Sequence, residues 1–152
     1  PAFHGLQRDR LRDWAREEAD RARVGQWLAG RFGAGHRLAL KPAGRIPYET
    51  GMKAVDFYGL VDRRAARSGH WIPANWIGHR RVSVDRVFAF EPDLVLLDEH
   101  LYSKDALPDP LGGEGPVARQ WRSDPRRMRY RVARAQVAPG EWLQYWIRRG
   151  TP

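Results

Sequence analysis

Residues 91–97 of the chain read Glu91-Pro92-Asp93-Leu94-Val95-Leu96-Leu97. The last four residues are apolar without interruption, whereas a strand with one face in water alternates apolar and polar residues. The stretch therefore predicts a strand over residues 93–97 that is buried on both faces, as in the middle of a sheet covered by helices. Pro92 separates this strand from residues 82–89, which have weak helical character.

Segments on the N-terminal side predict two further strands, at residues 37–40 and 53–57. Between them, residues 44–51 are punctuated by Gly and Pro and are expected to form a loop. Residues 59–67 favour a helical turn that carries three arginines.

The C-terminal third predicts a loop followed by a hairpin. Residues 102–122 are rich in Pro and Gly and are expected to be loop-like. Residues 129–137 and 142–148 contain the β-branched and aromatic residues that favour strands, and a short Ala-Pro-Gly-Glu turn joins them.

The N-terminal part, residues 9–32, predicts a long amphipathic helix that ends at Gly33 and Gly35. Its expected buried arc contains Leu11, Trp14, Ala15, Ala22, Leu28, Ala29 and Phe32. Val24 and Trp27 fall outside this arc. Trp27 is expected to be a partly covered surface residue, with contact to a neighbouring domain or a lipid headgroup layer as the alternative.

Length and composition are those of one domain. The chain has 152 residues, of which 42% are hydrophobic, enough for a single core. No stretch approaches the roughly 18 consecutive apolar residues of a membrane span. We expect residues 1–152 to form one soluble α/β domain, with a small mixed sheet packed with helices, a long N-terminal helix and a C-terminal β-hairpin.

No recognised catalytic or metal-binding pattern occurs. Cysteine is absent, which excludes disulfides and thiolate chemistry. Several histidines and carboxylates lack the spacing of metal ligands: His70, His79, Asp98, Glu99 and His100. The glycines within residues 30–35 follow a helix rather than a strand, so they do not form a dinucleotide fingerprint. We expect no metal, no cofactor and no catalytic residue in this chain.

Asp56 and Asp62 are the candidates for a catalytic carboxylate pair, because Asp56 lies in an apolar strand and Asp62 follows it after a turn. A pair of carboxylates can act as acid and base. The favoured interpretation is that each accepts backbone N–H bonds and caps a turn.

The net charge of +9 comes mainly from arginine, which makes anions the expected partners. Nucleic acid, anionic lipid headgroups and phosphorylated sugars all fit, as do arginines that are simply solvated. Residues 70–81 combine basic and aromatic side chains; the candidate ligand-binding residues there are Trp71, Trp76, Arg80 and Arg81. They could stack on sugars, lie at a membrane interface or pack into the core.

Four segments together resemble a known family: residues 43–48 (Ala-Gly-Arg-Ile-Pro-Tyr), 55–62 (Val-Asp-Phe-Tyr-Gly-Leu-Val-Asp), 78–79 (Gly-His) and 91–97. This series of segments, in this order, resembles that of the soluble extracytoplasmic, C-terminal region of bacterial multi-spanning glycosyltransferases of the GT-C type. These enzymes use polyprenyl-phosphate-linked sugars. The resemblance covers roughly residues 36–100. Its structural motif residues are Gly44, Pro47, Tyr48, Asp56, Gly59 and Asp62.

The resemblance implies that these motif residues shape the fold and that the reacting groups lie outside this chain. It also implies that the chain is cut from a larger protein, with the helix at 9–32 following the last membrane span. The expected location is the inner or cytoplasmic membrane, with the domain on its extracytoplasmic (periplasmic) face. The expected partners are the membrane-spanning region of the same protein and either an acceptor glycan or a lipid-phosphate-linked sugar donor.

Two alternatives from other classes stay open. The arginines could serve a nucleic-acid-binding module, although the chain has no helix-turn-helix, RNP or zinc-finger pattern and its arginines are dispersed. The domain could also be purely structural and brace the membrane part without binding a ligand.

Overall fold

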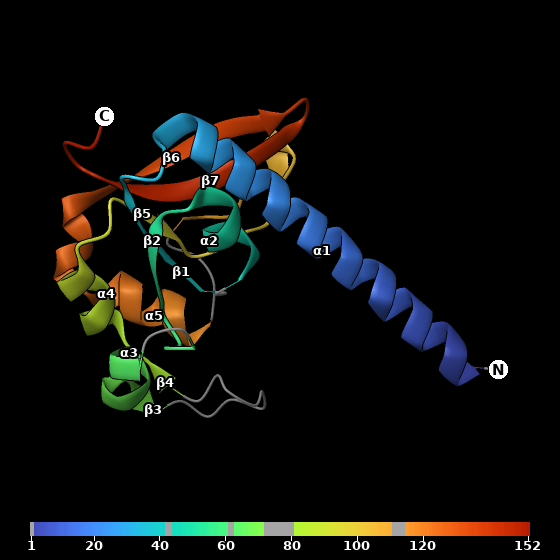
Figure 1. The fold of residues 1–152 in the computed structure, drawn as a ribbon, viewed down its shortest axis with the longest axis horizontal. Coiled ribbons are helices and arrows are strands. Elements are labelled where there is room, and N and C mark those ends of the chain that lie inside the picture. The colour runs from blue at the N-terminus through green and yellow to red at the C-terminus, as the bar shows by residue number, and fades with distance from the viewer. Residues whose placement is uncertain (1, 42–43, 61–62, 72–80, 111–114) are drawn as a thin grey trace.

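The centre of the fold is a five-stranded mixed sheet with the strand order β2-β1-β5-β7-β6 (Figure 1). The computed structural model describes residues 2–41, 44–60, 63–71, 81–110 and 115–152. The strands of the sheet are β1 (Arg37–Leu40), β2 (Lys53–Asp56), β5 (Leu94–Leu96), β6 (Tyr130–Ala138) and β7 (Glu141–Arg148). β2, β1 and β5 run parallel, and the β6–β7 hairpin joins β5 antiparallel. The predicted fold class is confirmed.

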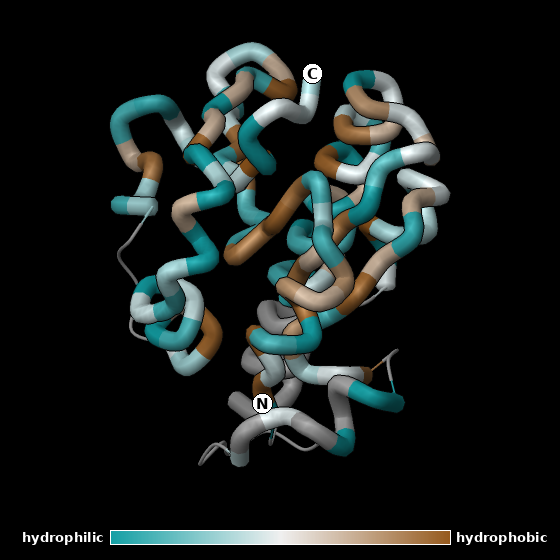
Figure 2. Tube along the Cα trace, turned by 90° about the vertical axis from the view of Figure 1, so that its left-hand side faces the viewer, coloured by the Kyte–Doolittle hydropathy of each residue, from teal (hydrophilic) through white to brown (hydrophobic). Residues whose placement is uncertain are grey.

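The central strand is β5, as the sequence predicts. Leu94, Val95 and Leu96 are fully buried, and β5 is paired with β1 on one side and β7 on the other. In Figure 2, long apolar stretches of the chain cross the middle of the molecule, whereas polar residues predominate at the outer bends. An uninterrupted apolar run fits this position because both faces of β5 are covered.

Helices cover both faces of the sheet. The α-helices are α1 (Ala2–Phe32), α2 (Arg45–Thr50), α3 (Arg63–Ser68), α4 (Val84–Phe90) and α5 (Pro116–Ser123). Smaller elements are the strands β3 (His70–Trp71) and β4 (Arg81–Val82) and the 3-10 helices η1 (Lys104–Ala106) and η2 (Pro125–Arg129). Val24 and Leu28 of α1 belong to the core on one face, and Phe88 of α4 and Trp121 of α5 belong to the core on the other.

The predicted buried arc of the N-terminal helix is wrong in its first half. Leu11 and Trp14 are 60% and 62% exposed, whereas Val24, expected outside the arc, is fully buried. The reason is that only the C-terminal half of α1 reaches the sheet; its N-terminal half projects away from the rest of the molecule (Figure 1). Trp27 is partly covered and contacts Tyr145 edge-on at 5.9 Å. Among the described residues, no helix combines the length and apolar composition needed to cross a bilayer.

Two segments expected to be loops contain helices. Residues 44–51 include α2. Pro47 does not prevent this helix, because it lies in the first turn, where a backbone N–H is not needed. Gly51 ends α2 in a left-handed conformation with a φ of 63°. Residues 102–122 include most of α5, which starts at Pro116 and buries Val117 and Trp121. Gly and Pro mark the ends of short helices as well as loops, which explains both errors.

Gly25 lets α1 approach α2 closely. A Cβ atom at Gly25 would lie 2.6 Å from Cβ of Glu49 and 3.4 Å from Cα of Ile46. We expect Gly25→Ala to lower the free energy of unfolding by about 1–2 kcal/mol, because overpacking outweighs the gain in helix propensity.

The matched control is Gly30→Ala on the same helix, where the added Cβ meets no atom within 4 Å. This variant is expected to raise the free energy of unfolding by about 0.5–1 kcal/mol through helix propensity alone. Urea unfolding of both variants measures the difference. Equal effects of the two substitutions would contradict the close approach of α1 and α2.

Candidate functional site

The parallel strands create a natural place for a ligand at their carboxyl ends. From β1 the chain passes through α2 to β2 on one side, and later through α4 to β5 on the other side of β1. The strand order therefore reverses direction between β1 and β5. In open α/β sheets, ligands bind in the crevice outside the carboxyl ends of the strands at such a switch point.

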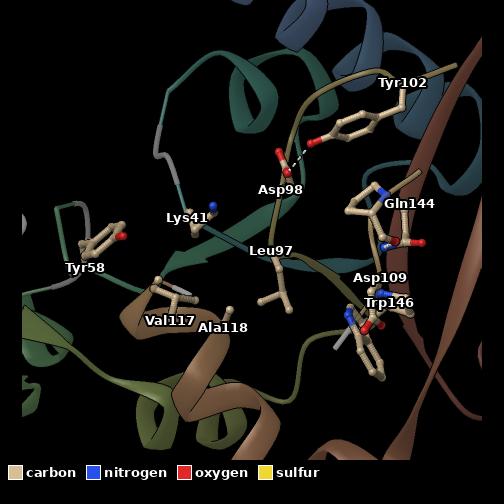
Figure 3. Close-up of a pocket in the computed structure, with 13 residues that line it drawn as sticks. Lys41, Tyr58, Leu97, Asp98, Tyr102, Asp109, Val117, Ala118, Gln144 and Trp146 are labelled. Atoms are coloured by element: carbon tan, nitrogen blue, oxygen red, sulfur yellow. Dashed lines mark hydrogen bonds between the residues drawn. The ribbon is translucent and has the colours of Figure 1, made fainter. Parts of the chain in front are cut away.

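A pocket with a volume of about 340 Å³ lies at this switch point (Figure 3). The volume is within the range of roughly 300–1,000 Å³ that is typical of small-molecule sites. Lys41 follows β1, Asp98 lies just beyond β5, and Tyr58 comes shortly after β2. Gln144 and Trp146 of β7 contribute to the pocket from the antiparallel part of the sheet.

Asp98 and Tyr102 form a fixed polar pair in the pocket wall. The hydroxyl of Tyr102 donates to Oδ2 of Asp98 at 2.5 Å, and the backbone N–H of His100 donates to Oδ1 at 3.1 Å. Burial, and then the hydrogen bond to Asp98, raise the pKa of Tyr102 above its ordinary value. Tyr102 therefore stays protonated at neutral pH and orients the Asp98 carboxylate.

The same wall is held to β7 by backbone and side-chain bonds. Tyr102 and Trp142 exchange both backbone hydrogen bonds, at 2.9 and 2.7 Å. The side chain of Gln144 donates to the carbonyl of Pro108 at 3.1 Å and accepts from Nε of Arg134 at 2.9 Å. The segment after β5 therefore crosses the pocket in a defined position.

The pocket floor is apolar and aromatic. Trp146 is only 6% exposed and contacts Trp121 edge-on at 5.7 Å, and Val117 and Ala118 of α5 also line the pocket. Burial, and then the charge of Glu99, raise the pKa of Tyr58, which keeps its hydroxyl neutral. Aromatic surface next to a few fixed polar groups suits a ligand with hydroxyl groups and apolar ring faces, as a sugar has.

The described part of the chain contains no group of three or more His, Asp or Glu side chains that could hold a metal ion. The pocket can bind a ligand through hydrogen bonds and through contact with its apolar surface. The hydrogen-bonding residues are Lys41, Asp98, Gln144 and the two tyrosines, Tyr58 and Tyr102.

Residues 9–148 match the family described as "Domain of unknown function (DUF8728)". The chain belongs to this family. No curated protein and no solved structure matches the chain. The matched range extends from α1 to the end of β7, so every element that builds the pocket lies inside the family domain.

The ligand-binding residues expected from the sequence lie elsewhere or are not described. Trp71 is 63% exposed on β3, next to Arg81 in the β3–β4 pair. Arg81 donates to the backbone carbonyls of Arg67 and Gly69, at 3.0 and 3.3 Å, and so ties β4 to the end of α3. Trp71 and Arg81 are not among the residues that line the pocket. Trp76 and Arg80 lie outside the described residues.

The second segment of the resemblance noted in the sequence, residues 55–62, contains an aspartate that positions a pocket residue. Asp56 is fully buried, and its Oδ1 accepts from the backbone N–H groups of Tyr58 and Leu60, both at 2.9 Å. Gly59 continues the turn with a φ of 72°. The turn directs Tyr58 into the pocket wall, so Asp56 acts on the site through the backbone. Asp62 lies outside the described residues.

The first segment of that resemblance, residues 43–48, contains the start of α2, and its described residues do not line the pocket. Gly44 precedes the helix with a φ of 141°, and the carbonyl of Pro47 accepts from the backbone N–H of Gly51 at 3.0 Å. Tyr48 is 81% exposed, and the guanidinium of Arg45 lies 6.0 Å from the centre of its ring. None of these residues lines the pocket.

Sequence reasoning missed the main pocket residues, Lys41, Tyr102, Gln144 and Trp146, and considered Asp98 only as a metal ligand. One signal was available, because Lys41 and Asp98 each come just after a predicted strand. Polar residues at the carboxyl ends of parallel strands are the usual ligand-binding positions. The parallel pairing of those strands was needed to use this signal.

Proposed function

We propose that this domain is the extracytoplasmic part of a membrane-bound sugar transferase and that its switch-point pocket holds the acceptor glycan. The observation that carries the proposal is the pocket itself, in which Lys41, Asp98 and Gln144 surround an aromatic floor. Such a combination recognises sugar hydroxyls by hydrogen bonds and sugar ring faces by apolar contact. The order of motifs that resembles GT-C glycosyltransferases supports the enzyme class.

The charges of the pocket favour an acceptor sugar over a phosphate-linked donor. Asp98 and Asp109 line it together with a single lysine, Lys41, and no described arginine does so. A phosphate group would be repelled by the two carboxylates, whereas the hydroxyl groups of a neutral sugar can donate hydrogen bonds to them. Phosphate recognition usually relies on arginine, which makes a two-pronged contact with the anion.

The structure supports nucleic-acid binding less strongly than the arginine-rich composition does. Arg21, Arg126 and Arg148 are paired with carboxylates of the chain. Arg37 and Arg127 donate to backbone carbonyls. These five arginines therefore make contacts within the fold. A nucleic-acid-binding module would show affinity that falls log-linearly with salt concentration, which a neutral-sugar site would not.

The reaction itself is assigned to the membrane-spanning region of the same protein. A base that activates the acceptor hydroxyl and cations near the leaving phosphate are needed there. The role of this domain is to bind the acceptor and present it. The proposal predicts that the open reading frame encodes several membrane spans upstream of Pro1, and a gene without such spans would contradict the assignment.

Sugar binding can be tested on the purified domain. We expect a neutral hexose or disaccharide to shift the NMR signals of the Trp146 indole N–H and the Gln144 amide, and hexose 1-phosphate to bind more weakly. Asp98→Ala is expected to weaken sugar binding about tenfold to a hundredfold, because hydrogen bonds to a charged group contribute about 1.5–3 kcal/mol.

The matched control is Asp105→Ala, which removes an exposed carboxylate of the nearby helix η1 that does not line the pocket. This variant is expected to bind sugar as the unchanged domain does. If no hexose or disaccharide in a broad panel shifts either signal, or if hexose 1-phosphate binds more tightly than the matching hexose, the acceptor proposal is wrong.

A further inference from the structure

Two arginines of α1 attach this helix to the wall of the pocket. Nη2 of Arg21 lies 3.1 Å from Oε1 of Glu99, the residue that follows Asp98. Glu99 is only 8% exposed, so this ion pair is largely shielded from water. Glu17 and Glu18 of α1 also bind the Arg21 guanidinium, at 3.2 and 2.5 Å, and hold it against its own helix.

The second attachment is made by Arg23. Its guanidinium pairs with Glu141, the first residue of β7, and with Asp20 of α1 at 2.5 Å. Glu141 precedes Trp142, whose backbone bonds to Tyr102. Arg21 and Arg23 therefore bind the two segments that meet at this backbone bridge.

Apolar contacts complete the attachment. Leu101, the residue before Tyr102, packs in the same core cluster as Val24 and Leu28 of α1. Figure 3 shows α1 beyond the segment that carries Asp98 and Tyr102, on the side away from the pocket. The wall of the pocket is thus held between the ligand space and the C-terminal half of α1.

The N-terminal half of α1 extends beyond the contacts that attach the helix to the body of the fold (Figure 1). Leu11 and Trp14 are exposed, and Figure 1 shows this half of the helix projecting from the body. An α-helix rises about 1.5 Å per residue, so Leu11 lies ten residue steps, or about 15 Å along the helix axis, from Arg21. A change in the orientation of the N-terminal half is passed along the helix to Arg21, because the backbone hydrogen bonds keep the helix stiff.

We propose that Arg21 and Arg23 are positioning residues that couple the orientation of α1 to the shape of the pocket wall at Asp98 and Tyr102. The effect on ligand affinity rests on the proposed sugar-binding function, whereas the mechanical coupling does not. A contact made by the projecting N-terminal half of α1 would then change how tightly the pocket holds its ligand.

Amide hydrogen exchange tests the coupling without any ligand. Arg21→Gln is expected to speed exchange of the Tyr102 and Trp142 amides at least tenfold, and exchange within the β1–β2 pair should not change. Arg21→Lys keeps the charge toward Glu99 and is expected to restore most of the protection. Arg12→Gln, the same change at an exposed residue in the projecting half of α1, serves as the control and should leave all rates unchanged.

Uniformly faster exchange throughout the sheet would show that Arg21 acts on overall stability only, and unchanged rates at Tyr102 would show that it does not hold the wall; either result overturns the proposal.

The sugar titration is then repeated with Arg21→Gln, for which at least fivefold weaker binding is expected. Unchanged sugar affinity would overturn the link from α1 to the ligand. If the unchanged domain binds no sugar, the proposed function fails, while the exchange experiment still decides the coupling.

Discussion

Replacing Trp121 with alanine is expected to lower the free energy of unfolding by about 3–5 kcal/mol. Trp121 is fully buried, and its ring stacks on Phe88 with 5.0 Å between ring centres and 8° between the planes. Its edges contact Tyr130 at 5.3 Å and Trp146 at 5.7 Å. Removing the indole leaves a cavity between α4, α5 and the sheet that rigid neighbouring rings cannot fill.

Urea unfolding measures this loss against two controls. Trp14→Ala removes an indole that is 62% exposed and should change the free energy of unfolding by no more than about 0.5 kcal/mol. Trp121→Phe should cost clearly less than Trp121→Ala, because Nε1 of Trp121 has no hydrogen-bond partner among the described residues. Similar losses for Trp14→Ala and Trp121→Ala would show that Trp121 does not hold this half of the core.

Replacing Asp56 with alanine is expected to lower the free energy of unfolding by about 2–3 kcal/mol. The carboxylate accepts two backbone hydrogen bonds at a fully buried position, and its loss leaves both donors of the turn without that acceptor. Tyr58 is one of the two donors and lines the pocket, so the variant should also weaken sugar binding. The effect is larger than that of most surface carboxylates because water cannot reach Asp56 to replace it.

Asp56→Asn is the informative companion variant. The backbone bonds from Tyr58 and Leu60 both go to Oδ1 of Asp56, and an asparagine oxygen can accept them at the same place. The loss of stability should therefore be about 1 kcal/mol or less, and Tyr58 should keep its NMR position. If Asn destabilises as much as Ala, the charge of Asp56, rather than its acceptor geometry, stabilises the turn.

These two residues connect the stability of the fold to the candidate site. Trp121 supports the floor through Trp146, and Asp56 holds the turn that carries Tyr58. The third support is the attachment of α1 through Arg21 and Glu99. The pocket is therefore supported by the sheet and by the helices on both of its faces, so a change in any of these layers is expected to alter the proposed sugar affinity.

Most strands could be predicted from local pattern. The run from Leu94 to Leu97 predicts a buried central strand, and the structure has β5 in that place. The closing hairpin was predicted from its aromatic and β-branched residues. The helix α2 was missed because Gly44 and Gly51, which flank it, punctuate a loop in the same way. Short helices depend on contacts with the rest of the protein, so their own residues carry a weak signal.

The candidate site was far less predictable. The aromatic and basic residues Trp71 and Arg81 are conspicuous in the sequence, but they do not line the pocket. Lys41, Asp98 and Gln144 carry no common motif and are distant in the chain. They line one pocket because β1, β5 and β7 are neighbours in the sheet.

The α/β class, the long helix, the central strand and the hairpin follow from local patterns, because uninterrupted or periodic apolar residues dictate local backbone structure. Which part of α1 is buried, and where the pocket lies, depends instead on how the elements pack together. An apolar side chain is buried only where another element lies opposite it, which is true of Val24 and not of Trp14. The position of a binding site likewise depends on the order of the strands in the sheet. That order results from the long-range packing of segments, which no local pattern specifies.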